Sequence, residues 1–310
     1  FPVLRSIIPA IDSTQYRGFL AENYSMDTKG DTVVIVIGGI TTDLIFLKSI
    51  DNGNTWNKSI LQSFPIPLFD ANSDTLPSGG VIVASGDAHI RIDNNGISHV
   101  FWSNIRVVSD TMEGTLKLGW LPFETDAILY WNETHPIGEI DTIARALDAN
   151  GDGVINLIHN APMACKVGYY TPTYTQFPTA AVDSANNLFV SYHSVCENCD
   201  TTILDRMHNH IYTIASQDGG QTWSQPLDID KDIDSLFHEN AYPCLAKKAN
   251  GEVHIVFQQD IYPGHSLLDP CPPYWGINGP PESNILYTKI DYTGPGGFPW
   301  RFGTIGVQSI

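Results

Sequence analysis

The segment "DANGDGVIN" carries the oxygen side chains of a candidate metal site. Asp148, Asn150, Asp152 and Asn156 occupy positions 1, 3, 5 and 9 of this turn, and Gly153 occupies position 6. Oxygen atoms on alternate residues around a bend that glycine permits can wrap a hard cation, with a backbone carbonyl as a further ligand. We therefore expect Ca²⁺ here, against the alternative of a metal-free turn rich in Asp and Asn.

This segment resembles the start of an EF-hand loop, although position 12 is His159 where that family has a bidentate Glu. Because strands rather than helices are expected on both sides, it looks more like the calcium hairpins of integrin-type propeller blades. We expect the ion to be structural, because we place this turn on the same side of the molecule as the repeated turns described below.

Two cysteines and two histidines in "CENCDTTILDRMHNH" could hold a softer metal. Cys196, Cys199, His208 and His210 are ligand types of tetrahedral zinc, but their spacing is not a standard one. In an oxidising compartment a Cys196–Cys199 disulfide is more favoured than zinc, and free thiols are the other alternative.

The remaining cysteines give a weaker signal. Cys244 and Cys271 flank a long segment and could pair, which would leave Cys165 alone. Five cysteines in 310 residues do not define a disulfide scaffold.

These groups must be positioned by elements that repeat. The stretch "SIDNGNTWNKS" (49–59) recurs as "SQDGGQTWSQP" (216–226) with equal spacing of the shared residues. Each copy follows an alternating apolar run, so it predicts a hairpin turn with a positive-φ Gly and a Trp that anchors the returning strand. The turn residues are Ser49, Asp51, Gly53, Thr55 and Trp56 in one copy, and Ser216, Asp218, Gly220, Thr222 and Trp223 in the other.

The pattern Ser-x-Asp-x-Gly-x-Thr-Trp resembles the Asp-box (BNR repeat) of sialidase-like β-propellers. The resemblance implies an all-β fold of four-stranded antiparallel blades. In that family the Asp-box is a structural turn remote from the binding face.

Further hairpin patterns support this fold class. An alternating strand, a Gly/Asn/Asp turn and a more apolar strand follow one another in five segments, which predicts five blades. The resemblance implies six, with residues 1–20 and 301–310 closing one ring, so we expect a single propeller domain over 1–310. The five segments are 23–39, 89–102, 142–159, 178–194 and 243–258.

Strands of a blade alternate in direction, so the repeated turns and the Gly/Asn turns should share one face. The opposite face should collect the long segments 103–125, 159–168, 193–208 and 259–284, and function concentrates in such loops. Polar and aromatic residues at their mouths predict a carbohydrate or peptide site. The candidates are Trp102, Asn104, His159, Tyr192, His193, His238, Glu239, Gln258 and Asp260, to which links between blades add Asp87, His89 and Asp141.

A sialidase-like activity needs an arginine cluster for the substrate carboxylate. The family's early Arg-Ile-Pro motif is absent, since "LRSIIP" places Arg5 and Pro9 at another spacing. We therefore expect a non-catalytic module that binds a glycan or an extracellular protein through the long-loop face. A sialidase-like glycoside hydrolase or lyase, and a structural part of a larger surface protein, are the alternatives.

Charge and composition narrow the partners and the compartment. The formal charge of −18 argues against nucleic acid or an anionic membrane surface, and no apolar run is long enough to insert in a bilayer. Because the chain begins without Met or a signal peptide, we expect a processed product. Asp-Ser/Thr-hydrophobic triplets such as "DTV" (31–33) and "DTI" (141–143) resemble the O-glycosylation pattern of secreted Bacteroidota proteins. We therefore expect a bacterial protein that is secreted or at the cell surface.

Overall fold

The computed structural model describes residues 7–20, 23–110, 117–121, 124–155, 173–197, 208–230, 238–260 and 283–293. Within these segments every regular element is a β-strand, and all strand pairings except one are antiparallel. The expected all-β class is therefore confirmed. Alternating burial explains the strands, as in Thr32–Gly38, where Val34 and Val36 are fully buried.

The first and third sheets are meanders in which consecutive strands pair, and in both of them the repeated octapeptide joins the third strand to the fourth. The first sheet contains β1 (Tyr24–Lys29), β2 (Thr32–Gly38), β3 (Leu44–Ser49) and β4 (Asn57–Gln62). The third contains β11 (Thr175–Asp183), β12 (Leu188–Val195), β13 (Asn209–Ser216) and β14 (Leu227–Asp228), with β16 (Lys248–Ala249) parallel to β11.

The second sheet corrects two predictions. Segment 103–125 is not irregular throughout, because the buried Ile105 and Val107 continue the long strand β7 between two partners. Residues 141–144 form β10 (Asp141–Ala144), which pairs with β9 (Ile128–Asn132) as an outer strand of this sheet, so in the described residues they do not start the hairpin predicted at 142–159, of which 156–159 lie outside them. The strands are β5 (Val81–Ala84), β6 (His89–Ile92), β7 (Ser98–Asp110), β8 (Lys117–Leu121), β9 (Ile128–Asn132) and β10 (Asp141–Ala144).

The fourth sheet has three strands in the described residues, in the order β15, β17, β18. They are β15 (Glu239–Leu245), β17 (Glu252–Asp260) and β18 (Asn284–Asp291). The hairpins predicted at 23–39, 89–102, 178–194 and 243–258 are thus present, and the described part of the chain holds four sheets.

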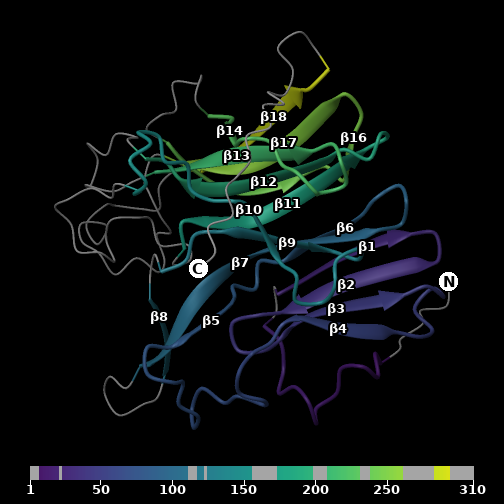
Figure 1. Ribbon diagram of the computed structural model, residues 1–310, viewed down its shortest axis with the longest axis vertical. Coiled ribbons are helices and arrows are strands. Elements are labelled where there is room, and N and C mark those ends of the chain that lie inside the picture. Colours follow the sequence, from purple (N-terminus) through teal and green to yellow (C-terminus); the bar gives the residue numbers. More distant parts are fainter. Residues whose placement is uncertain are drawn as a thin grey trace.

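The core lies between successive sheets, which are arranged in chain order from the first sheet at the bottom of Figure 1 to the fourth sheet at the top. Phe46 of the first sheet shares a buried cluster with Trp102 of the second. Phe101 and Val190 belong to the cluster between the second and third sheets, and Phe189, Ile255 and others fill the next one. Burying such large apolar side chains is the main source of stability for stacked sheets.

The first strands of the sheets, taken as β1, β6, β11 and β15, lie beside one another in chain order, and β5 is outside this series because it pairs with the far end of β7. β6 contacts β1 and β11, and β15 contacts β11. Lys247, directly after β15, reaches back to β1, where it donates to the Asp27 carboxylate and to Thr28 O at 3.1 Å. The four first strands therefore surround a common axis.

One end of the sheets, on the right in Figure 1, consists of tight turns, and we call it the turn face. Its turns bond to one another from sheet to sheet. Lys29 Nζ donates to Asp93 O at 2.8 Å, Asn94 Nδ2 to Asp183 O at 2.6 Å, and Tyr292 Oη to Asp183 Oδ2 at 3.1 Å. Both octapeptides lie on this face, because each follows a third strand that runs in the same direction as the first.

The two octapeptides form the same turn. Asp51 accepts hydrogen bonds from Thr55 N at 2.8 Å and Thr55 Oγ1 at 2.7 Å, and Asp218 accepts the same pair from Thr222 at 2.9 and 2.6 Å. The bond from the Thr55 backbone, with those from its hydroxyl and from Ser49, lowers the pKa of Asp51 to about 2. The carboxylate therefore holds the turn while ionised.

Candidate functional site

The opposite end of the sheets, which we call the loop face, is where second strands turn into third strands and each sheet passes the chain to the next. Its described parts include 38–43, 84–89, 144–155, 173–177 and 238–242. Side chains from different sheets meet there around the axis, so it can build a composite site.

Two aromatic rings meet where β11 and β15 begin. The rings of Phe177 and Tyr242 lie 4.9 Å apart at 62°, and the buried His193 packs against both, at 5.1 and 6.1 Å. Tyr242 is 37% exposed. We call Phe177 and Tyr242 the aromatic platform. An exposed ring on such a rigid support is a surface on which the apolar face of a sugar can pack.

The platform is held in a strained conformation. Phe177 has φ 52° and Tyr242 has φ 55°, and each directly precedes a proline, Pro178 or Pro243. Bulky residues avoid this region, and a following proline makes a helical conformation still less favourable. Both residues sit where the strand register shifts, between Gln176 and Thr179 and between Ala241 and Cys244. Strain of this kind concentrates at functional sites.

Asp87 fixes the platform from the second sheet. Its Oδ2 accepts hydrogen bonds from Phe177 N at 2.8 Å and from Ser103 Oγ at 2.5 Å, and Oδ1 accepts one from Ser103 N at 3.1 Å. Ser85 donates to the same carboxylate. Asp87 was predicted, as part of a link between blades, to face the site, and in the structure its carboxylate positions Phe177.

Two aspartates lie at the end of β14, beside the start of β15. Asp228 Oδ2 is 2.9 Å from His210 Nδ1, and Asp230 Oδ2 accepts a hydrogen bond from Ile211 N at 2.8 Å. Burial raises the pKa of Asp230 to about 6, the Asp228 charge adds to this, and the bond from Ile211 N and the nearby His210 oppose it. Asp230 is 0% exposed.

A third acid, Asp126, precedes β9 on the same face. It accepts hydrogen bonds from Ala146 N at 2.9 Å and Thr175 Oγ1 at 3.3 Å, yet burial raises its pKa. Burial also raises the pKa of Tyr192 and Tyr212, whose rings stack at 5.9 Å, so both hydroxyls stay protonated. Asp230 is thus an acid of the loop face that keeps its proton toward neutral pH, and burial shifts the pKa of Asp126 in the same direction.

The candidate calcium turn lies on the loop face, which corrects its predicted place. β10 starts at the turn face, so the residues after Ala144 emerge at the opposite end. Oxygen atoms of Asp148, Asp152 and Glu197 lie within 4.8 Å of one another, and the Glu197 carboxylate accepts Ala149 N at 2.7 Å. Sequence reasoning missed Glu197, because it comes from the end of β12.

The same turn is also closed by its own backbone. Asp148 accepts hydrogen bonds from Gly151 N at 2.6 Å and Gly153 N at 2.7 Å, and Asn150 accepts one from Asp152 N at 2.9 Å. Both alternatives, a cation site and a metal-free turn, are therefore compatible with the described residues. Asn156, the fourth predicted ligand, lies outside them.

Several predicted site residues belong to the core. Trp102 and Tyr192 are 0% exposed, and the Trp102 indole donates to Gln62 Oε1 at 2.9 Å. Glu239, 1% exposed, accepts hydrogen bonds from Asn209 N at 2.6 Å and Asn209 Nδ2 at 2.7 Å. These buried side chains pack under the loop face and are not accessible to a ligand.

Three other predicted residues lie nearer the surface. Asn104, His238 and Gln258 are half-buried, and Gln258 donates to Ser283 Oγ at 3.1 Å. Asp260, in contrast, is buried at the end of β17. His159 lies outside the described residues.

Two predicted links between blades have other roles. Asp141 is wrong as a loop-face residue, because it begins β10 at the turn face and pairs with His135 at 3.5 Å. Burial lowers the pKa of His89 to about 3, so that side chain is neutral.

The cysteine predictions are tested only in part. Cys244 is a free, exposed thiol, so its suggested pairing with Cys271 is not formed. Cys196 is buried and disulfide-bonded, and Cys199, its predicted partner, lies outside the described residues. Ligand atoms of Cys196, His210 and Asp228 lie within 4.8 Å of one another, but a disulfide-bonded sulfur supplies no thiolate, so this group does not support the zinc alternative of Cys196, Cys199, His208 and His210.

Comparison with known proteins comes from structures alone, since neither a protein-family model nor a curated protein matches the sequence. Xylan β-1,4-xylosidase from Bacillus halodurans C-125 is 12% identical, with 89% of this chain and 42% of that chain covered and a TM-score of 0.38. A thermostable family-43 glycoside hydrolase is 14% identical, with 92% and 72% covered and a TM-score of 0.36. The Hadza microbial sialidase Hz136 is 15% identical, with 76% and 41% covered and a TM-score of 0.41.

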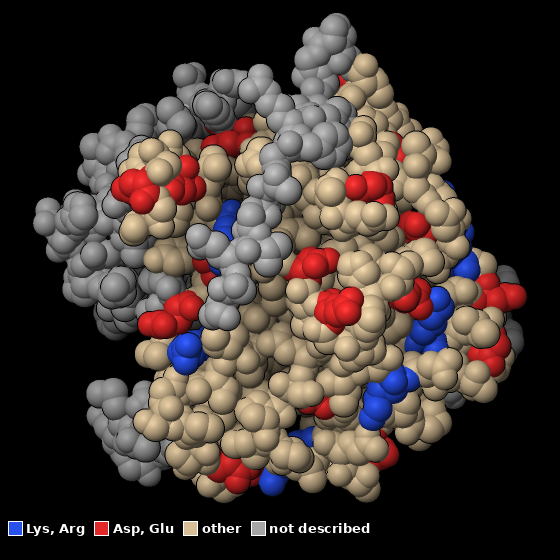
Figure 2. All heavy atoms as spheres, viewed as in Figure 1, with Lys and Arg blue, Asp and Glu red and all other residues tan. Residues whose placement is uncertain are grey.

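This chain therefore spans less than half the length of that xylosidase and that sialidase. At such TM-scores these likenesses carry no argument about fold or activity, which rest here on the chain's own strands and side chains. In the described part of the chain no helix is long and apolar enough to cross a membrane. Acidic side chains are spread over the face shown in Figure 2, in keeping with the charge of −18.

Proposed function

We propose that this protein binds a glycan on its loop face and acts on it as a glycoside hydrolase or lyase. The aromatic platform carries the proposal. Phe177 N donates a hydrogen bond to Asp87 of a neighbouring sheet, and the Tyr242 ring packs against Phe177, so binding a sugar costs little ordering of these rings. A pyranose ring can pack its C–H face on Tyr242 while its hydroxyls meet the polar groups around the axis.

The acids of the loop face favour catalysis over binding alone. A carboxyl group with a pKa of about 6 can donate a proton near neutral pH, and Asp230 is such a group, beside Asp228. Glycosidic bond cleavage uses one protonated and one ionised carboxyl group. A module that only binds does not need such a pair.

A non-catalytic glycan- or protein-binding module is the second candidate. The observation in its favour is the burial of Asp230, which is 0% exposed and therefore does not contact a substrate in this conformation. A structural part of a larger surface protein is the third, but the exposed ring of Tyr242 gives the loop face a feature that a purely structural role does not require.

We further propose that residues 1–310 form one β-propeller with Asp-box turns, in five or six blades. Meander sheets whose first strands surround a common axis support this arrangement. The expected location is the bacterial cell surface or the extracellular medium, with a glycan or an extracellular protein as partner and no nucleic acid or membrane insertion.

Calcium is the expected cofactor. Asp148, Asn150 and Asp152 would supply oxygen ligands from one turn, and Glu197 would supply the carboxylate that the turn itself lacks. The ion would brace the turn after β10 against the end of β12, a structural role on the loop face. Zinc is not favoured.

A glycan array and a panel of fluorogenic glycosides and unsaturated-uronide assays, run on one calcium-containing sample, test the proposed function. Turnover of any substrate supports the hydrolase or lyase. Binding without turnover supports the module instead, and silence in both assays contradicts a glycan function and favours a protein partner.

A further inference from the structure

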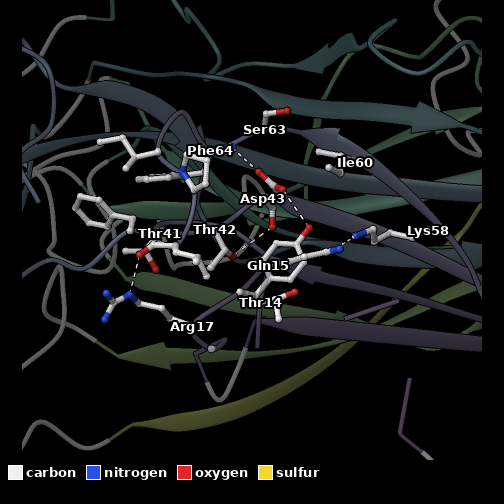
Figure 3. Close-up of a pocket in the computed structure, with 16 residues that line it drawn as sticks. Thr14, Gln15, Arg17, Thr41, Thr42, Asp43, Lys58, Ile60, Ser63 and Phe64 are labelled. Carbon is white, nitrogen blue, oxygen red and sulfur yellow. Dashed lines mark hydrogen bonds between the residues drawn. The ribbon is translucent and has the colours of Figure 1, made fainter. Parts of the chain in front are cut away.

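A cavity of 510 Å³ lies against the edge strand β4 of the first sheet, and neither ring of the aromatic platform lines it (Figure 3). Residues 14–18 form one wall and residues 63–69 form another. The first wall is fastened by Lys58 Nζ, which donates to Gln15 Oε1 at 2.5 Å. A segment that only shielded an edge strand would pack down on it, whereas this one leaves a space of the size that small-molecule sites have.

The polar groups of the cavity comprise one fixed acceptor and several donors. Asp43 Oδ1 accepts a hydrogen bond from Phe64 N at 2.7 Å, and Oδ2 accepts a long one from Tyr16 Oη at 3.2 Å. Burial and the Asp43 charge raise the pKa of Tyr16 to about 12, so its hydroxyl remains a donor. Lys58 Nζ donates to Gln15 Oε1 and lies 5.3 Å from the centre of the Tyr16 ring, so a ligand would share its remaining ammonium N–H groups with that ring.

The apolar part of the cavity is equally well defined. Phe64 and Phe69 pack at 5.2 Å and are buried, and Leu68 at the rim has φ 51°. Arg17 holds this strained residue in place, because Arg17 Nε donates to Leu68 O at 2.7 Å and Nη1 pairs with Asp70 at 2.8 Å.

These groups decide the charge of the ligand. Arg17 is already neutralised by Asp70, and Asp43 would repel a carboxylate or sulfate. A carboxylate acceptor, an amide, an ammonium donor and an aromatic ring together match alternating hydroxyls on an apolar ring. We propose that this cavity binds one uncharged hexose unit of a glycan, as a second site distinct from the platform. The inference rests on the proposed glycan function and extends it.

Lysine footprinting reads this site directly. The wild-type protein is acetylated with a water-soluble acetylating reagent, with and without cellohexaose, xylohexaose, mannohexaose or trigalacturonic acid, and each lysine is followed by mass spectrometry. At least one of the neutral sugars should slow acetylation of Lys58. Lys248, exposed on the turn face, is the internal control and should react at an unchanged rate.

Variants separate this site from the platform. In the Tyr242→Ala variant, the sugar should still protect Lys58 from acetylation. When Asp43→Asn or Lys58→Gln is added to that variant, calorimetry should show binding of the protecting sugar about tenfold weaker, which is the effect of one charge-assisted hydrogen bond. Using two variants keeps the test valid if Asp43→Asn disturbs the fold.

Each outcome has one meaning. Binding that depends on Tyr242 and leaves Lys58 reactive would refute the cavity site and retain the proposed function. Protection by trigalacturonic acid alone would refute the uncharged ligand. Protection of Lys58 in a protein whose platform variants bind normally supports the cavity site while contradicting the platform.

Discussion

The turn face and the loop face are built by the same strands, yet they use opposite backbone chemistry. On the turn face the positive-φ residues are glycines and the asparagines Asn52 and Asn186, which tolerate that conformation. Among the described residues of the loop face, the positive-φ residues other than glycine are Ile40, Leu68, Phe177 and Tyr242, which do not tolerate it. On the turn face, the residue types of each turn accept positive φ without strain. On the loop face, contacts between sheets hold unsuitable residue types in that conformation.

The difference indicates a division of labour. The turn face is held by hydrogen bonds within each turn and between neighbouring turns, so it stabilises the sheets. On the loop face, strained backbone and buried acids lower the stability of the fold while they hold rings and carboxyl groups in place, as is common at functional sites. The following predictions test this contrast, beginning with the largest effect.

Glycine substitutions measure how rigid the turn face is. At Gly220, with φ 94°, an added Cβ would overlap the Tyr130 hydroxyl, whereas at Gly53 the nearest atom is 3.8 Å away, in Trp56. We expect Gly220→Ala to lower the free energy of unfolding by about 3 kcal/mol and Gly53→Ala by about 1 kcal/mol, since overpacking adds to the positive-φ strain. Urea denaturation compares them, and equal losses would contradict the account.

The acid pair predicts a pH dependence. The folded pKa of Asp230 is about 6, above the ordinary value of 3.8, so the unfolded chain loses its proton first as pH rises. Stability from this group is therefore full below about pH 4 and is lost as pH rises through about 6. Asp230→Asn should remove a decrease on the order of 2 kcal/mol across that window. If the free energy of unfolding, measured in urea, changed with pH in the same way for the wild type and for Asp230→Asn, Asp230 would be ionised across this window and the prediction would be wrong.

Calcium binding at the turn of Asp148 and Asp152 should stabilise the loop face. At ten times its dissociation constant the ion should add about 1.4 kcal/mol, a rise of a few degrees in Tm over an EDTA sample. Asp148→Asn combined with Asp152→Asn should abolish the difference, and Asp141→Asn on the turn face should preserve it. The same Tm with calcium and with EDTA would leave a metal-free turn.

The smallest effect tests the strain. Tyr242→Gly should leave Tm unchanged or raise it slightly, because glycine accepts φ 55° without cost. The matched change Tyr287→Gly, at an exposed tyrosine within β18, should lower stability by about 1 kcal/mol, since glycine weakens an ordinary strand. Losses of the same size at both positions would mean that Tyr242 stores no strain.

The contrast also explains what the sequence could predict. The turn of Ser49, Asp51 and Thr55 closes through its own side chains, so its residues and spacing were sufficient. Trp102 and Tyr192 looked like site residues because the strands predicted from sequence end near them, but both lie within longer strands, β7 and β12, and point into the core. A shift of one residue exchanges the two sides of a strand.

The residues that were missed depend on contacts between sheets. The dipeptides Phe177-Pro178 and Tyr242-Pro243 were visible as a repeat, but their positive φ accompanies a register shift in each strand, and Asp87 holds the backbone of Phe177 in addition. Asp228 and Asp230 form an Asp-x-Asp pair whose side chains share one side of a strand end, a signal that could have been read from alternation. Glu197 joins Asp148 only because β10 and β12 end at the same face.

The central claim is that glycans bind on the loop face at Tyr242, and the most direct measurement compares three proteins on one glycan array. The wild type, Tyr242→Gly and a turn-face control, Ile50→Ala at a 66% exposed position, are applied with calcium after their folding is verified. The account predicts that Ile50→Ala binds like the wild type and that Tyr242→Gly, equally stable, loses binding by about tenfold, the contribution of one stacked ring. Undiminished binding by Tyr242→Gly would contradict it.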